Sequence, residues 1–453
     1  MPSARDIAAS ALGDRGGNVS AHLDRLLGQS QLSGADFAFA RELALGAVRR
    51  KATLQAVLRA HLARPDQPLP AGLTNILHVA LYKLLFLDRV PGFAAVNEAV
   101  KQASAGRFRS QAGMVNGILR SVLRGLSGVT VGKPPLSPEI VPVGAGAYRA
   151  FDRDIFPDPA GDAAAYIAAA YSLPIDLARR WTVRHGLEGA VELAAHADSR
   201  APFILRVNRL KGDVDAARAA LAVDGVQAVV HANGQSLVLA EHANIVELKA
   251  FHEGLIQPQD ATATAVGLAA GVAPGMRVLD FCAAPGTKTT HLAELMDNRG
   301  SIVALDVSDD KLARIGDNCR RMGVSIVTTM QAPEVTRLSP ESFDVVLADV
   351  PCSNTGVLAR RAEARWQFDQ KRLAAVVKDQ RFLAAAAAMF VKRGGRMIYS
   401  TCSVEPEENE QLAAGLIRVN PRLKLVRQRL TLPAGADAPE QWHDGGYYAI
   451  LSR

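Results

Sequence analysis

The stretch Val278–His291 reads VLDFCAAPGTKTTH and decides the fold. An apolar run ends on Asp280, small residues with Pro285 and Gly286 follow, and a helical pattern begins at Thr287. A strand, a tight loop and a helix in this order hold a nucleotide-like cofactor at the carboxyl end of a strand in doubly wound α/β domains. The spacing GxGxxG is absent, so a dinucleotide has little support. The loop therefore predicts a cofactor site of another kind.

Strand and helix patterns alternate from residue 251 to the C-terminus, which predicts a catalytic α/β domain over 251–453 with a mostly parallel sheet and helices on both faces. We expect a Rossmann-like fold. The expected strands are 277–280, 301–305, 326–330, 343–348 and 396–400, and the expected helices are 261–269, the segment after Gly286, 309–322 and 371–391.

The chain before this domain divides into three parts. Residues 1–128 follow helical periodicity and predict an all-α domain, and the Pro- and Gly-rich residues 129–164 indicate a linker. Residues 165–250 predict a small α+β domain. Its expected helices are 174–186, 188–197 and 214–222, and its expected strands are 203–207, 228–230 and 236–239.

The bulk composition describes a soluble protein, because hydrophobic residues at 49 % and charged residues at 21 % are ordinary globular values. The longest apolar runs, 76–87 and 382–391, are too short to cross a bilayer. No signal segment follows the first residues, so we expect a cytoplasmic protein with no membrane partner. The four cysteines form no CxxC pair, so neither a metal site nor a disulfide framework is expected. Separately, we expect the protein to be a monomer.

Basic residues are concentrated near the N-terminus. Residues 1–150 hold 18 Lys and Arg against 9 Asp and Glu, a net charge of +9, whereas the remainder holds 34 against 36. Such a basic region suits a polyanionic partner, because Lys and Arg displace counterions from phosphates. A solvated basic surface is the alternative.

Two stretches of this region carry a resemblance. They read VPGFAAVNEAVKQA over 90–103 and GMVNGILRSVLR over 113–124. In the second, helical spacing places Met114, Ile118 and Val122 on one face and Asn116, Arg120 and Arg124 on a neighbouring polar face. Both stretches resemble the RNA-binding domain of the antitermination factor NusB. The resemblance implies an RNA-binding bundle, although a core stripe beside a solvated face is the commoner meaning of this pattern alone.

Three further strand ends carry reactive side chains. The strand IVALDVS presents Asp306, whose carboxylate can accept hydrogen bonds from two ribose hydroxyls. The backbone amides after Gly286 can bind a carboxylate. S-adenosylmethionine has both a ribose and a carboxylate. Asp306 could instead cap the helix that follows. The stretch VVLADVPCSNTG presents Asp349 and Cys352, and RMIYSTCSVEPEEN presents Cys402. Lone cysteines are usually buried hydrophobes, but two at strand ends beside a cofactor site indicate chemistry.

Methylation of cytosine at carbon 5 uses these groups. Thiolate addition at carbon 6 turns the ring into a nucleophilic enamine, a carboxyl group at nitrogen 3 assists the addition, and a base later removes the proton from carbon 5. Asp349 suits nitrogen 3, and either cysteine could be the nucleophile, because the residues alone do not rank them.

The stretches DFCAAPGTK, ALD, DVPCSNTG and STCSVEPEEN resemble the motifs of the Sun/RsmB family of RNA cytosine-5 methyltransferases, in the right order and behind a NusB-like domain. The closing GGYYAILSR is similar to the last strand of that family. The resemblance implies S-adenosylmethionine-dependent methylation of a cytosine in small-subunit (16S) ribosomal RNA through a covalent cysteine–cytosine intermediate. The RNA partner is 16S ribosomal RNA, free or in early assembly particles.

The resemblance also implies roles for individual residues. Cys402 matches the nucleophile, Cys352 the residue that assists product release and Asp349 the acid beside the reacting base, and Lys288 belongs to the catalytic group as well. The residues that match the cofactor site are Cys282, Ala283, Ala284, Pro285, Gly286, Thr287, Lys288, Asp306 and Asp349.

The sequence departs from the family pattern beside the expected adenine position. The stretch MQAPEV places Ala332 where the family has an acid, and Glu334 or Gln331 could replace that acid. Thr287 replaces the second glycine of the loop, and the proline expected after Gly356 is absent. Two alternatives remain open: a ribosome-assembly factor whose methyltransferase domain has degenerated, and a methyltransferase for transfer RNA.

Overall fold

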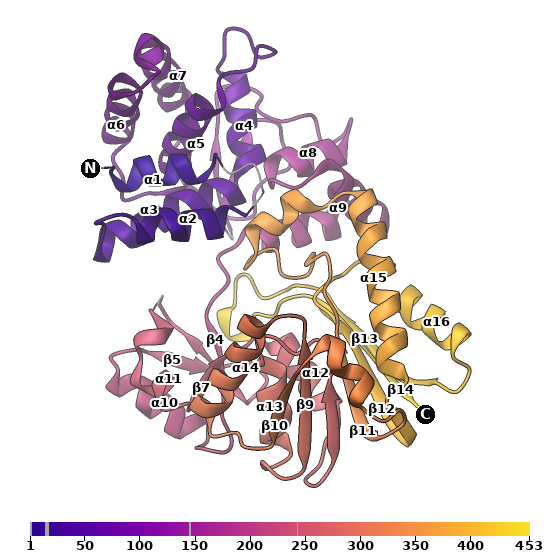
Figure 1. Cartoon of the computed structure of the whole chain (residues 1–453). Helices are drawn as coiled ribbons and strands as arrows, with labels where there is room; N and C mark the ends of the chain where they lie inside the picture. Colours follow the sequence, from indigo (N-terminus) through magenta and orange to yellow (C-terminus); the bar gives the residue numbers. More distant parts are fainter. Residues whose placement is uncertain (1, 14–17, 145, 242) are drawn as a thin grey trace. The chain divides into compact units, whose positions relative to one another are not determined.

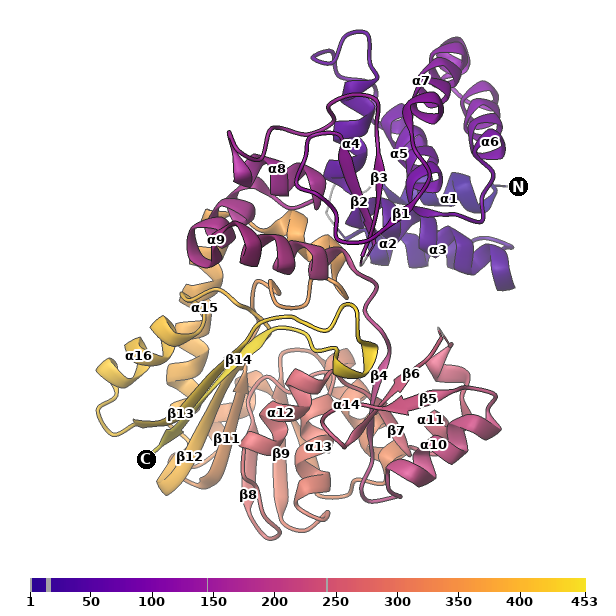
Figure 2. The same ribbon diagram turned by 180° about the vertical axis from the view of Figure 1, so that it is seen from behind.

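The computed structural model describes residues 2–13, 18–144, 146–241 and 243–453, and the chain forms two compact units. A helical unit comprises Met1–Ser199 together with Leu358–Asp369, and a sheet unit comprises Arg200–Val357 together with Gln370–Arg453. The elements of both units are labelled in Figure 1 and are seen from behind in Figure 2.

A seven-stranded sheet is the centre of the sheet unit. Its spatial order is β10-β9-β8-β11-β12-β14-β13, in which β14 runs antiparallel to β12 and β13 and the other pairs are parallel. This arrangement confirms the expected α/β fold. The strands are β8 (Arg277–Asp280), β9 (Ser301–Asp306), β10 (Val327–Gln331), β11 (Phe343–Asp349), β12 (Val391–Thr401), β13 (Lys424–Thr431) and β14 (Gly446–Ser452).

Successive residues of the central strands face opposite cores. Val278 and Val345 belong to one buried cluster, whereas Leu279 and Val346 belong to another, as the two-residue period of a strand requires. The first cluster includes buried side chains of α12 (Ala261–Ala269), α13 (Thr287–Leu295) and α14 (Asp309–Met322). The second includes side chains of α15 (Gln370–Ala388) and α16 (Glu410–Val419). Helices therefore cover both faces of the sheet (Figure 1).

A smaller sheet in the same unit has the order β5-β6-β4-β7 and is antiparallel throughout. Its strands are β4 (Ile204–Val207), β5 (Ala228–Val230), β6 (Ser236–Leu239) and β7 (Ile256–Pro258), with α10 (Val214–Val223) and α11 (Lys249–His252) beside them (Figure 2). The periodicity predicts β4, β5, β6 and α10, but it does not predict β7, which is too short to show alternation.

The helical unit is built around α5 (Ala71–Phe86), which packs against α1, α3, α4, α6 and α7. Being apolar on nearly every side, α5 is the buried core helix that its long apolar run requires. No helix in the described ranges has both the length and the apolarity needed to span a bilayer. The other helices of the bundle are α1 (Ala4–Ala11), α2 (Val19–Gly28), α3 (Gly34–Arg49), α4 (Lys51–Ala60), α6 (Gly92–Ala105) and α7 (Ala112–Gly125).

The remainder of the helical unit follows α7. Residues 129–164 contain a three-stranded antiparallel sheet of order β1-β3-β2 and the start of α8 (Ala163–Ala170). Its strands are β1 (Thr130–Val131), β2 (Ile140–Gly144) and β3 (Ala147–Ala150). The next helix, α9 (Ile175–Asp198), is interrupted at Gly186, where φ is 71°. This left-handed backbone suits glycine and confirms the expected division into two helices.

The buried face of α7 differs by one position from the predicted stripe. Ile118 and Val122 are buried as expected, but Met114 is 38 % exposed, and Val115 and Leu119 complete the core face. The prediction for Met114 was wrong because residues four apart drift around a helix of 3.6 residues per turn.

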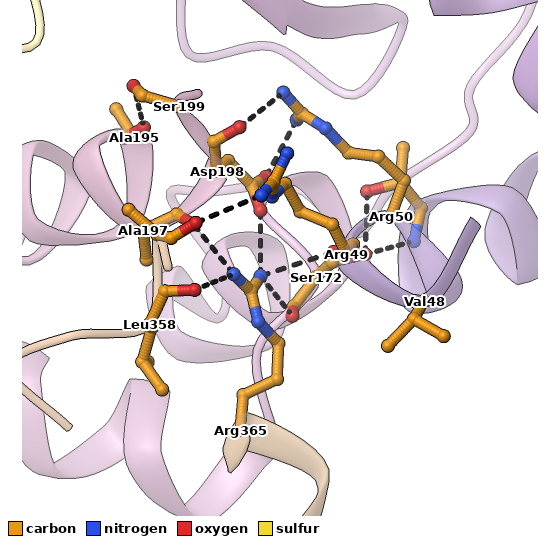
Figure 3. Close-up of polar contacts among 12 residues, drawn as sticks. Val48, Arg49, Arg50, Ser172, Ala195, Ala197, Asp198, Ser199, Leu358 and Arg365 are labelled. Carbon is orange, nitrogen blue, oxygen red and sulfur yellow. Dashed lines mark hydrogen bonds and ion pairs between the residues drawn. The ribbon is translucent and has the colours of Figure 1, made fainter. Parts of the chain in front are cut away.

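Residues 358–369 belong to the helical unit although both neighbouring segments belong to the sheet unit. They contain the 3-10 helix η4 (Ala362–Gln367). The guanidinium of Arg365 is fully buried and donates to Asp198 Oδ1 at 2.7 Å, while Arg50 donates to Asp198 Oδ2 at 2.7 Å (Figure 3). Burial and the charge of Arg365 lower the pKa of Arg49 to about 10. One buried carboxylate therefore neutralises part of a cluster of three arginines.

We expect Asp198→Leu to destabilise the helical unit by about 3–5 kcal/mol, because it leaves Arg50 and Arg365 buried without their counter-ion. Denaturant unfolding followed by circular dichroism measures the loss. The control Asp24→Leu removes an exposed ion pair with Arg41 and should change stability by less than about 1 kcal/mol. Equal effects of the two variants would contradict the role of Asp198.

Candidate functional site

The loop after β8 passes directly into α13 at Gly286. Gly286 has φ 95°, and a Cβ at this position would lie 3.1 Å from the backbone Cα of Ile315, so only glycine fits. The loop is attached to the neighbouring strand, since Ala283 N donates to Leu305 O at 2.9 Å and Ala284 N donates to Asp306 Oδ2 at 3.0 Å. The helix begins at Thr287 as predicted, which places its amino end beside the carboxyl ends of β8 and β9.

Asp280 is buried at the end of β8. Its Oδ2 accepts a hydrogen bond from Thr289 Oγ1 at 2.7 Å, whereas its Oδ1 has no hydrogen-bond partner in the described part of the chain. Burial raises the pKa of Asp280 to about 7, and the charge of Asp349 adds to this rise. An unpartnered buried acceptor is costly, so a donor from a bound molecule would be favourable here.

Asp306 ends β9, as the sequence predicts, and its carboxylate is mostly buried. Oδ1 accepts from Val307 N at 2.7 Å and contacts Lys311 Nζ at 3.1 Å, and Oδ2 binds the cofactor loop through Ala284. The Asp306 side chain therefore joins two strand ends. The alternative of a helix cap has no support, because Ser308 occupies the N-cap position of α14.

Asp349 ends β11 and joins three elements. Its Oδ2 accepts from Lys288 Nζ of α13 at 2.6 Å, and its Oδ1 accepts from Ser400 Oγ of β12 at 2.6 Å. Burial alone would lower the pKa of Lys288, but the charge and hydrogen bond of Asp349 outweigh burial and the pKa is raised. Lys288 therefore stays an ammonium group beside the ends of β11 and β12.

The two strand-end cysteines meet. Cys352 Sγ and Cys402 Sγ lie 2.9 Å apart, and Cys402 Sγ also lies 3.3 Å from Asn354 Oδ1. The loops touch through their backbones too, since Gly356 N donates to Cys402 O at 3.0 Å and Gly445 N donates to Gly356 O at 2.7 Å. A Cβ on Gly356 would lie 2.8 Å from Cys402 O, so this close approach requires glycine.

The other two cysteines have different surroundings. Burial raises the pKa of Cys282 to about 12, with a further rise from the charge of Asp280. Cys319 lies on the buried face of α14, where burial raises its pKa to about 11. Thiols of such high pKa are poor nucleophiles at neutral pH. Cys352 and Cys402 differ from them because their two sulfur atoms are in contact at the ends of neighbouring strands, so they are the candidate catalytic pair.

Ala332, which the sequence places on the expected adenine side, is the first residue of the 3-10 helix η3 (Ala332–Arg337). Gln331 Nε2 donates to Asp309 Oδ1, and Glu334 accepts from Gln331 N at 3.3 Å while pairing with Arg337. An open groove of about 640 Å³ runs between α14 and β10, and both Gln331 and Glu334 line it. Both candidate replacements for the missing acid are thus at the groove.

Sequence reasoning missed three polar side chains of the site. Asn354 lies beside the thiols with φ 62°, Ser400 holds Asp349, and Glu408 lies buried behind both cysteine loops. The stretches PCSNTG, YSTCS and PEEN contain all three, but their contacts depend on residues far away in the sequence. No group of His, Cys, Asp and Glu suitable for a metal ion occurs in the described ranges.

Comparisons with known proteins identify the family of the chain. The model of the family described as 16S rRNA methyltransferase RsmB/F matches residues 270–449, the NusB family matches 2–124, and an RsmF/B-like ferredoxin-like domain matches 174–246. The probable ribosomal RNA small subunit methyltransferase B of Synechocystis is 32 % identical over 90 % of this chain and 88 % of its own length. Ribosomal RNA small subunit methyltransferase B of Sodalis glossinidius is also 32 % identical, over 91 % of this chain and 88 % of its own length.

A solved structure, that of PH0851, covers 100 % of this chain and 98 % of its own, with a TM-score of 0.75 and 23 % identity, and so supports the fold. The seven-stranded sheet and the family match together define an α/β methyltransferase domain. The chain belongs to the RsmB/F family of 16S rRNA methyltransferases. It is an RNA cytosine-5 methyltransferase with an N-terminal NusB domain and a ferredoxin-like middle domain.

We expect mild oxidation with diamide to join Cys352 to Cys402 while Cys282 and Cys319 remain thiols, because only the first two sulfur atoms are in contact. Peptide mass mapping without reduction measures the pairing. The control Cys319→Ser should leave the cross-link unchanged. A cross-link between any other two cysteines would contradict the geometry of the site.

Proposed function

We propose that this chain methylates carbon 5 of a cytosine in 16S ribosomal RNA, with S-adenosylmethionine as methyl donor and a covalent cysteine–cytosine intermediate. The chain would act in the cytoplasm on free RNA or early assembly particles. The observation that carries the proposal is the 2.9 Å contact of Cys352 and Cys402 beside the Lys288–Asp349 pair. This set supports the proposal because it offers a candidate nucleophile, a second thiol and a candidate acid–base pair at the ends of neighbouring strands.

The residues at the strand ends fit S-adenosylmethionine. The unpartnered Oδ1 of Asp280 suits a cationic donor, the Asp306 carboxylate suits ribose hydroxyls, and the amino end of α13 suits a carboxylate. When bound, this cofactor supplies an electrophilic methyl group. The residues that would hold it are Cys282, Ala283, Ala284, Pro285, Gly286, Thr287, Lys288, Asp306 and Asp349, with Gln331 or Glu334 on the adenine side.

Cys402 is the proposed nucleophile. The thiol proton leaves to solvent, the thiolate sulfur forms the bond to carbon 6 of cytosine, and the electron pair of the double bond moves through the ring toward nitrogen 3. The Lys288–Asp349 pair holds a proton close by and stabilises the charge that develops at nitrogen 3. Ser400 keeps the Asp349 carboxylate in place for this task through its 2.6 Å hydrogen bond.

Cys352 is proposed to act after carbon 5 has been methylated. The proton on carbon 5 must leave before the bond between Cys402 and carbon 6 can break, and Cys352 or a water molecule beside it takes that proton. The contact of the two sulfur atoms places Cys352 next to the carbon–sulfur bond that must break.

The NusB domain is proposed to bind the RNA. Arg120 and Arg124 on α7 are exposed, as predicted for its polar face, and Asn116 accepts from Arg120 Nε at 3.0 Å. Lys101 at the end of α6 and Arg107 and Arg109 just after it are exposed as well. These cations give the domain a basic surface suited to phosphates.

The roles of the two thiols predict opposite phenotypes. Cys402→Ser should abolish methyl transfer to unmethylated 16S RNA, because the sulfur atom that attacks carbon 6 is lost. Cys352→Ala should accumulate a covalent protein–RNA adduct, because release is blocked. Labelled methyl incorporation and a shifted band on a denaturing gel measure the two effects, with Cys319→Ser as an active control. Full activity of Cys402→Ser beside an inactive, adduct-free Cys352→Ala would reverse the assignment.

The alternative of an assembly factor without catalysis is motivated by Ala332. Calorimetry with S-adenosylmethionine should show binding by the unmodified chain and about tenfold weaker binding by Asp306→Ala, since the ribose would lose its acceptor. The exposed Asp310→Ala is the control. Absence of binding by the unmodified chain would favour the assembly factor. A separate experiment tests the transfer RNA alternative, which would be favoured if a deletion strain lost methylated cytosines from its transfer RNA.

A further inference from the structure

Glu408 is a buried carboxylate that binds both cysteine loops. Its Oε1 accepts from Ser353 N at 2.8 Å and from Gln380 Nε2 at 2.9 Å. Its Oε2 accepts from the hydroxyl groups of Ser353 and Ser403. Four donors therefore converge on one side chain that has no solvent exposure.

The partners of Glu408 flank the two thiols directly. Ser353 follows Cys352 in the sequence, and Ser403 follows Cys402. The two serine hydroxyls also lie 3.1 Å apart, and Thr355 Oγ1 lies 3.0 Å from Ser403 Oγ. The carboxylate is thus the common acceptor of a small network that sets the distance between the loops.

The donors to Glu408 are neutral. In the described part of the chain it takes part in no ion pair, and the donors are an amide N–H, a glutamine amide and two hydroxyl groups. Its negative charge is therefore held by hydrogen bonds alone and is not cancelled by a cation. Such a charge acts on nearby titratable groups more strongly inside a protein than in water.

The charge acts on one thiol of the pair. The hydrogen bond with Cys402, burial, and the negative charges of Cys402 and Glu408 raise the pKa of Cys352, while a backbone hydrogen bond at Asn354 lowers it. Tyr399 also faces Glu408 and Cys352, and its own pKa is raised mainly by burial, while Lys288 faces Cys402 with a positive charge. A negative group therefore lies near Cys352, and a positive group lies near Cys402.

We propose that Glu408 is a positioning residue for methyl transfer, which holds the Cys352 and Cys402 loops together and through its charge assigns different tasks to the two thiols. The proposal rests on the proposed function. Cys352 stays a thiol while Cys402 attacks, so the carbon 5 proton is later taken by the water molecule beside Cys352. The serine-bound carboxylate keeps both sulfur atoms in contact.

The substitution Glu408→Gln separates the charge from the geometry. The amide oxygen can still accept from Ser353 N and Gln380 Nε2, and the amide nitrogen can donate to the two serine hydroxyls, which rotate to accept. Glu408→Ala removes both the charge and the network. Glu410→Gln, two residues further along, is the matched control for loss of charge.

Two measurements need neither RNA nor cofactor, so they test the positioning even if the chain proves inactive as a methyltransferase. In Glu408→Gln, iodoacetamide should modify Cys352 at lower pH than in the unmodified chain, because the negative charge near this thiol is gone. At a fixed pH of about 8 the modification should be about threefold faster or more. The diamide cross-link should form at the same rate as in the unmodified chain. In Glu408→Ala, the cross-link should form more slowly. Thermal melting of each variant checks that it is folded, and Glu410→Gln should match the unmodified chain throughout.

Methyl transfer adds a third measurement. Glu408→Gln should lower kcat and shift its pH profile with KM for RNA unchanged, because the thiols and not the RNA contacts are altered. An unchanged alkylation profile of Cys352 in Glu408→Gln, together with a normal cross-linking rate in Glu408→Ala, would overturn the proposal while leaving the proposed methylation intact. If Glu408→Ala does not fold, the alkylation profile of Glu408→Gln decides alone.

Discussion

The reversal of strand order at β8 is the constraint on which the site depends. From β8 the chain adds β9 and β10 on one side and then β11 and β12 on the other, and all five strands run parallel. Their carboxyl ends must therefore lie along one edge, and the connections on either side of β8 diverge. The side chains at these ends, Asp280, Asp306, Asp349 and Cys402, come together for this reason although they span more than a hundred residues of sequence.

The same crowding creates an electrostatic problem that the fold resolves locally. Three carboxylates lie at neighbouring strand ends, and their repulsion contributes to the raised pKa of Asp280. Lys288 on α13 offsets part of this charge by pairing with Asp349, and Lys311 does so for Asp306. Glu408 is handled differently, through neutral donors, so its charge remains effective on Cys352. Asp349 and Glu408 therefore differ in their electrostatic effect, because Asp349 is paired with a cation and Glu408 accepts only from neutral donors.

Much of this arrangement could be predicted from the sequence because it is encoded locally. The strand ends at Asp280 and Asp306, the start of α13 at Thr287 and both ends of α14 agree with the residue pattern. Apolar runs, small residues and carboxylates mark these points within a few positions of one another. Given a parallel sheet, the proximity of Cys352 and Cys402 follows from the adjacency of β11 and β12.

The supporting contacts could not be predicted in the same way. Ser353 and Glu408 are 55 residues apart in the sequence, and nothing in PEEN distinguishes Glu408 from the exposed acids that such a stretch usually contains. Neither α16 nor β13 was expected, because short amphipathic segments near the C-terminus give weak periodicity. The exposed position of Met114 shows the same limit, since a helical stripe is uncertain by one residue.

Residues 358–369 show how a charged segment can belong to a core. Their sequence, LARRAEARWQFD, is polar and would suggest a surface loop. In the structure Arg365 is fully buried on Asp198, and its guanidinium also donates to the carbonyl groups of Ala197 and Ser172 (Figure 3). The next residue, Trp366, donates through Nε1 to Val48 O at 2.8 Å. The energy that orders this segment is therefore supplied by the helical unit. Val357 and Leu358 are consecutive, so the loop that contains Cys352 and Asn354 continues directly into residues 358–369. Those residues are ordered by their contacts within the helical unit.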